Sequence, residues 1–112
     1  MPMGQNNVGT LAYTLTPRGY QQIDLSDGLV HTLTLAPGLP GTLIVVMSAD
    51  GGAFRYRDDG TAPTITTGFK VANGGVFSIQ PEDASTLQLI RDGADTGMVD
   101  VLLYSYANSG EA

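Results

Sequence analysis

The sequence contains no cysteine, no tryptophan and a single histidine, and these absences exclude several kinds of chemistry. Without cysteine the chain has no disulfide bonds and no thiolate ligands for a metal ion. A Ser-His-Asp triad or a transition-metal site would depend on His31, which alternates in phase with the apolar Leu33 and Leu35. We therefore expect His31 to pack in or at the rim of a sheet. The serine-hydrolase motif G-x-S-x-G is also missing, and we expect no catalytic residue, no metal ligand and no cofactor.

Basic residues are scarce: five stand against 11 acidic residues, which gives a formal net charge of −6. Proteins that bind nucleic acids usually neutralise phosphates with a basic patch, and no run of basic residues occurs in this chain. The negative charge also disfavours an anionic membrane surface. The longest apolar run, Leu43–Met47, is far too short to span a bilayer, and the N-terminal residues do not resemble a signal peptide. We expect neither a nucleic acid nor a membrane as a partner.

Several segments of the sequence alternate apolar with polar or small residues, and this period of two residues predicts half-buried β-strands. The run Thr42–Ala49 is continuously apolar and predicts a buried central strand, and Met98–Tyr106 predicts the last strand. Apolar residues alternate with polar or small ones in Leu11–Leu15, His31–Leu35, Phe54–Arg57, Phe77–Ile79 and Leu87–Leu89.

Turn signals separate these segments. Five Asp-Gly or Asn-Gly pairs, which favour the positive φ angles of tight turns, contain Gly28, Gly51, Gly60, Gly74 and Gly93. The segment Ala36–Gly41 predicts another loop, and no window has a sustained helical period. We therefore predict an all-β fold, a single-domain β-sandwich or jelly-roll-like barrel of roughly eight short strands that covers residues 10–106.

The two ends of the chain are small and polar, with little to bury. Residues 1–9 are interpreted as a flexible N-terminal arm and residues 107–112 as a flexible C-terminal tail. The alternative is an arm that becomes ordered against a partner. The residues of the arm that would then contact the partner are Met1, Pro2, Met3, Gln5, Asn6 and Asn7.

Charged residues, only 14% of the chain, gather in the stretch AFRYRDDGTAPT, Ala53 to Thr64. We interpret it as a strand that leads into a sharply specified turn, in which aspartates accept bonds from turn amides or pair with arginines. The residues of this structural turn motif are Arg55, Arg57, Asp58, Asp59, Gly60 and Pro63. Calcium binding is the alternative, here or at Asp92–Asp95, although neither turn has the ligand spacing of an EF-hand. Carboxylate catalysis would require two acids that face each other across a groove, which the sequence does not establish.

The segment RYRDDGTAPT, Arg55 to Thr64, followed by Gly68 and an apolar strand, resembles a motif of small virion proteins of tailed bacteriophages. Two later segments, Leu87–Arg91 (LQLIR) and Val101–Tyr106 (VLLYSY), are similar to the strands that follow it in those proteins. The resemblance covers residues 42–106, and the residues before it match no family.

This resemblance implies a non-enzymatic decoration or cement protein that braces contacts between major capsid protein subunits. Its location would be the exterior of the capsid in the virion, after assembly in the host cytoplasm. The negative charge independently favours the outside of the shell, since packaged DNA repels it. We expect self-association into a dimer or trimer. The alternatives are a tail or fibre-associated virion domain, a carbohydrate-binding β-module that uses exposed tyrosines, and an enzyme with carboxylate chemistry.

Overall fold

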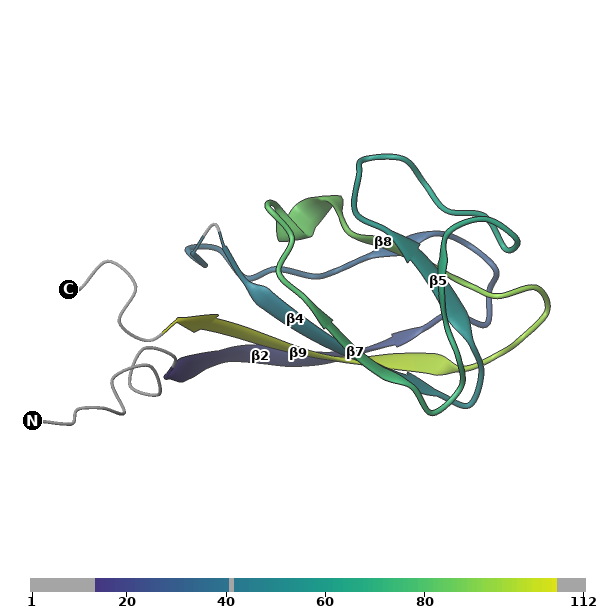
Figure 1. The fold of residues 1–112 in the computed structure, drawn as a ribbon, viewed down its shortest axis with the longest axis horizontal. Coiled ribbons are helices and arrows are strands. Elements are labelled where there is room, and N and C mark those ends of the chain that lie inside the picture. Colours follow the sequence, from purple (N-terminus) through teal and green to yellow (C-terminus); the bar gives the residue numbers. More distant parts are fainter. Residues whose placement is uncertain (1–13, 41, 107–112) are drawn as a thin grey trace, which may run out of the picture.

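The computed structural model describes residues 14–40 and 42–106, which form two antiparallel four-stranded sheets packed as a sandwich (Figure 1). The first sheet has the order β2 (Leu15–Asp24), β9 (Met98–Tyr106), β4 (Ile44–Asp50) and β7 (Val76–Ile79). The second has the order β3 (His31–Thr32), β8 (Gln88–Arg91), β5 (Phe54–Arg57) and β6 (Phe69–Val71). The predicted all-β fold is confirmed, and of the two expected architectures the sandwich is the one formed, because the sheets do not close into a barrel.

The core lies between the two sheets and follows from the two-residue period of the strands. On β9, Val99 and Val101 are fully buried, and on the neighbouring β4 so is Met47. The second sheet contributes Phe54 and Leu89 to the same cluster. Each such side chain stabilises the fold by about 1.5–3 kcal/mol relative to leaving it in water.

The central position of β4 is confirmed, since it lies between β9 and β7. The prediction that its whole apolar run is buried is wrong, because only alternate residues point into the core. Val45 is fully buried, whereas Ile44 and Val46 on the other face are half-buried. An antiparallel sheet covered on one side leaves its second face at the surface.

Two further strands differ from the prediction. The first described strand begins at Leu15 and continues to Asp24, through a register shift between Pro17 and Gly19 that local alternation does not reveal. The short edge strand β6 lies directly after Gly68, where the sequence indicates an apolar strand. Of the segment His31–Leu35, only the first two residues form a strand. The predicted alternation at Leu11–Tyr13 lies outside the described residues.

The turn predictions are confirmed by backbone angles: Gly28, Gly51, Gly60, Gly74 and Gly93 all have positive φ. The described residues contain one short 3-10 helix, η1 (Ala84–Thr86), capped by the Asp83 side chain. Within residues 14–40 and 42–106 no helix has the length and apolar character needed to cross a bilayer.

At one end of the sandwich two loops pass very close to each other. A Cβ atom added to Gly52 would lie 2.4 Å from the Thr96 carbonyl oxygen, and one added to Gly97 would lie 2.7 Å from the Gly52 nitrogen. The Asp95 carboxylate accepts a bond of 3.0 Å from the Ala53 amide and holds the two loops together. Two glycines therefore allow the β4–β5 and β8–β9 connections to cross.

Candidate functional site

The stretch that leaves β5 forms a compact turn. Asp59 accepts a 3.1 Å bond from Arg57 Nε and a 3.2 Å bond from the Thr61 amide, which closes the loop around Gly60. Gly60 has a φ of 85°, an angle that residues with a Cβ adopt only with strain. The Arg57 guanidinium holds the pKa of Asp59 below its usual range. The polar groups of this turn are therefore largely engaged with one another.

The Arg55 side chain turns away from this loop and pairs with Asp92. Its Nε lies 2.6 Å from Asp92 Oδ1, and its Nη1 donates to the Gly68 carbonyl at 3.0 Å. Lys70 Nζ lies 3.2 Å from the other oxygen of Asp92. These contacts connect β5, β6 and the end of β8. They lower the pKa of Asp92, chiefly through the bond from Arg55.

The two acidic turns considered for calcium contain four aspartates, and the carboxylates of Asp59, Asp92 and Asp95 make such bonds. Asp92 faces two cationic side chains, and Asp95 accepts from the Ala53 amide. Within the part of the chain that the structure describes, no three His, Cys, Asp or Glu side chains converge as ligands for a metal ion. These three carboxylates connect turns and strands.

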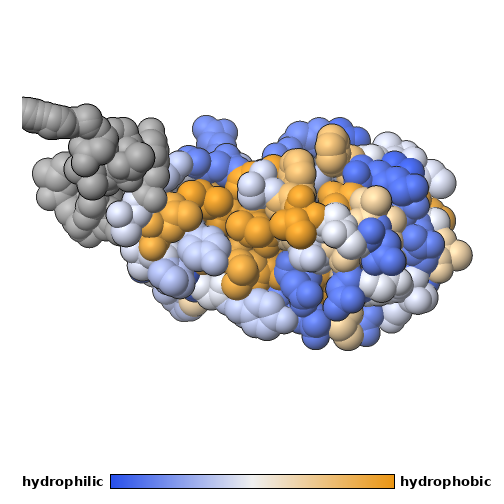
Figure 2. Space-filling model, turned by 60° about the horizontal axis from the view of Figure 1, so that its bottom comes forward, coloured by the Kyte–Doolittle hydropathy of each residue, from blue (hydrophilic) through white to orange (hydrophobic). Residues whose placement is uncertain are grey.

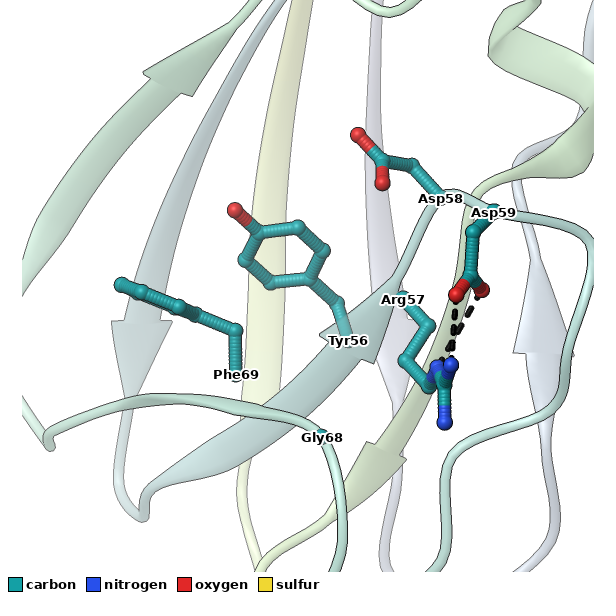
Figure 3. A pocket seen from close by; sticks show the side chains of 6 residues that line it. All are labelled: Tyr56, Arg57, Asp58, Asp59, Gly68 and Phe69. Atoms are coloured by element: carbon teal, nitrogen blue, oxygen red, sulfur yellow. Dashed lines mark hydrogen bonds and ion pairs between the residues drawn. The ribbon is translucent and has the colours of Figure 1, made fainter.

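A shallow hollow of about 260 Å³ lies beside the turn (Figure 3). Tyr56 lies between Phe69 and Asp58, and the bonded pair Arg57 and Asp59 closes the other side. Burial, together with the charge of Asp58, raises the pKa of Tyr56. The tyrosine hydroxyl is therefore neutral at physiological pH and is not a candidate for a general base.

Three aromatic rings connect the edges of the two sheets beside this hollow. The ring centroids of Tyr56, Phe69 and Phe77 lie 5.4–5.5 Å apart, at tilted angles that are favourable for aromatic pairs. Phe69 belongs to edge strand β6 and Phe77 to edge strand β7 of the other sheet. Phe69 remains 58% exposed although two rings hold it in place. It is a fixed aromatic surface that could stack on a ligand or a partner.

A second hollow of about 270 Å³ lies on the other side of the turn. Its lining includes four acidic residues: Asp58, Asp59, Glu82 and Asp83. Asp83 already accepts bonds from the amide and hydroxyl of Ser85, at 2.9 and 2.6 Å. The hollow lies where the chain leaves β5 and approaches β8, at one end of the central strands of the second sheet. It is therefore negative, and its own turn bonds hold its shape.

The single histidine lies on β3 at the edge of the second sheet. His31 Nε2 lies 2.9 Å from Asp27 Oδ1, and this contact lowers the pKa of Asp27. Asp27 also accepts a bond from the Leu29 amide. The pair fixes the turn between β2 and β3, as expected for a histidine at the rim of a sheet.

The outer face of the first sheet carries apolar side chains in cross-strand rows. One row contains Tyr20, Leu102 and Val46, and the next contains Pro17, Tyr104 and Ile44. Tyr20 and Leu102 are 61% and 40% exposed. Figure 2 shows this side of the molecule, where hydrophobic residues gather in a band. We call this surface, formed by the outward residues of β2, β9, β4 and β7, the apolar face.

Sequence reasoning missed the apolar face. The signal was present in Thr42–Ala49, a strand apolar on both sides, and it was interpreted as complete burial. In an antiparallel sheet the same pattern also arises when the second side of the strand is an exposed apolar surface that binds a partner.

The terminal residues proposed as partner contacts, Met1, Pro2, Met3, Gln5, Asn6 and Asn7, lie outside the described residues. The residues of the turn motif are brought together around one loop, except that Arg55 is directed to Asp92. In comparisons with protein-family models, curated proteins and solved structures, the chain has no significant match.

Proposed function

We propose that this chain is a non-enzymatic structural protein of a phage virion, a decoration or cement protein that braces major capsid protein contacts on the shell exterior. The observation that carries the proposal is the broad apolar face on one layer of a small sandwich. Contiguous exposed apolar surface of this kind marks protein–protein contacts. The resemblance of Arg55–Thr64 to virion proteins indicates the kind of assembly in which such a contact would serve.

The hollows near the turn support a structural role over catalysis. Both are smaller than the roughly 300–1,000 Å³ typical of ligand pockets. Asp59 and Asp83, which line the acidic hollow, hold turn bonds, and the Tyr56 hydroxyl stays protonated. A cement protein needs a rigid shape, and these bonds supply it.

The acidic hollow lies at one end of the second sheet, whereas the apolar face is the outer side of the first sheet, so the molecule has two distinct surfaces. A protein that connects capsomers requires at least two contact surfaces, one for each neighbour. The net charge of −6 favours the outer side of a shell, where it is separated from packaged DNA.

The test uses shells that lack the protein. Purified full-length protein is mixed with them, and we measure co-sedimentation and the temperature at which DNA is released. We expect saturable binding and a higher release temperature. An unrelated acidic β-sandwich at the same concentration serves as the control. If the protein neither binds nor raises the release temperature, the proposal is wrong.

A carbohydrate-binding module is the second candidate, favoured by the exposed Phe69 beside Arg57 and Asp58. Sugar rings stack on such aromatic surfaces and accept polar contacts at their edges. A glycan array with the wild type and Phe69→Ala tests this function. Binding that Phe69→Ala abolishes would support it, and an array without binding would remove it.

A further inference from the structure

The chemistry of the apolar face changes along the strands, and this change restricts how a partner can be oriented on it. Each row runs across the sheet through residues paired in register. The row of Leu102 also contains Tyr20 and Val46 and ends in Ser78 on β7. The next row toward Asp24 contains Gln22, Asp100 and Ser48 and ends in Val76. On strands β2, β9 and β4 the face is therefore apolar around Leu102 and Tyr104 and polar around Asp100.

We infer that the apolar face binds a second copy of this chain, face to face, about a twofold axis that crosses the strands near Leu102. The inference rests on the proposed function as a structural protein, and it identifies a second copy of the chain as the partner that covers the apolar face. Sheets pack naturally in this way, with strands within about 30° of each other and a separation of about 10 Å. The same interaction already holds the two sheets of each copy together.

The area is sufficient for such a dimer. β9 has nine residues and is therefore about 30 Å long, and four strands cover about 19 Å. Two opposed faces of this size bury on the order of 1,000 Å² in total, which reaches the lower range of specific interfaces. We therefore expect a dimer of modest affinity that forms at micromolar or higher concentration.

The twofold arrangement also keeps the Asp100 carboxylates of the two copies apart. An axis across the strands reverses the order of the rows, so the Asp100 row of one copy faces the Tyr104 row of the other. Because Asp100 is two residues from Leu102, the two Asp100 carboxylates lie about 13 Å apart along the strands. Each carboxylate already accepts bonds from Tyr20 and Gln22, at 3.1 and 2.9 Å. No like charges meet.

The exposed apolar side chains supply the driving force for binding a second copy. Exposed Tyr20 and Leu102, with half-buried Val46 and Ile44, would leave water together. Aromatic side chains such as Tyr20 and Tyr104 supply large contact area at such interfaces. At the far corner of the sheet Val76, 71% exposed, extends the same face.

The experiment measures association by sedimentation equilibrium from about 1 to about 500 µM, without shells. Leu102→Asp places a charge at the axis, and Leu29→Asp is the matched control, because Leu29 is 63% exposed in the turn between β2 and β3. We expect the wild type and Leu29→Asp to dimerise equally and Leu102→Asp to associate at least ~10-fold more weakly. Equal association of both variants would place the interface elsewhere.

A cross-linking experiment keeps the inference testable if Leu102→Asp does not fold. The chain has no cysteine, so Leu102→Cys and Leu29→Cys each introduce one unique thiol. A short bismaleimide matches the sheet separation of about 10 Å and should link two copies through residue 102, not through residue 29. A wild type that stays monomeric throughout, without selective cross-linking, would overturn the inference.

The shell assay then separates this inference from the proposed function. A monomeric wild type whose binding to shells is abolished by Leu102→Asp would show that the face contacts the shell, which rejects the second copy and leaves the virion role. A wild-type dimer that does not bind shells would reject the virion role and leave the second copy as the partner of the apolar face.

Discussion

Asp92 shows how one carboxylate can connect strands that are distant in the sequence. It directly follows β8, pairs with Arg55 of β5 and also faces Lys70 of β6. The bond from Arg55 is the main cause of its lowered pKa. A group with a depressed folded pKa contributes stability above its unfolded pKa, and that contribution is lost as the pH falls through the folded value.

We therefore expect Asp92→Asn to be less stable than the wild type at pH 7 and to lose less stability on acidification. The wild type should lose stability below about pH 4, where unfolded aspartates begin to bind protons. Urea unfolding at a series of pH values from 7 to about 2.5 measures both effects. Asp58→Asn is the control, since it removes the same charge without removing a described ion pair. Identical pH profiles for wild type and Asp92→Asn would contradict this account.

At the scale of elements, the crossing of two loops at Gly52 and Gly97 leaves no room for a side chain at either position. A methyl group at Gly52 would collide with the Thr96 carbonyl, which is backbone and cannot rotate away. The loops that connect the two sheets would have to separate, and the Asp95 bond to the Ala53 amide would be strained.

We expect Gly52→Ala to lower the free energy of unfolding by about 3 kcal/mol, because overpacking against backbone forces the loops apart. Gly60→Ala adds the same methyl group where nothing lies within 4 Å, so it reports only the cost of a positive φ, about 1 kcal/mol. Chemical denaturation of both variants measures the difference. A smaller loss for Gly52→Ala than for Gly60→Ala would mean that the crossing is not tight.

Elements with local signals were predictable from the sequence. The last strand, Met98–Tyr106, matches its predicted bounds, and the glycines after aspartate or asparagine have the expected backbone angles. These features depend on neighbouring residues alone. The pairing of Arg55 with Asp92, 37 residues away, depends on strand order instead.

Dependence on strand order also explains why the candidate surfaces were not predicted from the sequence. Phe69 and Phe77 meet because β6 and β7 are edges of different sheets that lie on the same side of the sandwich. The apolar face requires knowledge of which side of β4 and β9 the second sheet covers. Alternation gives the two sides of a strand but does not identify the one that is buried.

At the scale of the whole molecule, self-association has to overcome the repulsion between two copies of net charge −6. The proposed interface is mostly apolar, so its attraction depends little on salt, whereas the repulsion between copies is screened by ions.

We therefore expect the dimer to become severalfold tighter when the salt concentration is raised from about 20 to about 300 mM. Sedimentation equilibrium at both salt concentrations measures the change. Weaker association at high salt would indicate attraction between opposite charges instead, which the composition of the apolar face does not provide.

The pairing of the first and last described strands has one more consequence. Leu15 lies opposite Tyr106, so the path of the polypeptide through the sandwich is almost a closed ring. In a paired antiparallel position the two Cα atoms are only about 5 Å apart, a gap that a few residues can bridge. A circularly permuted gene, opened in the exposed turn at 36–40, would encode the same strand pairings. The architecture is therefore defined by which strands pair, and it does not depend on the order in which the strands follow one another along the chain.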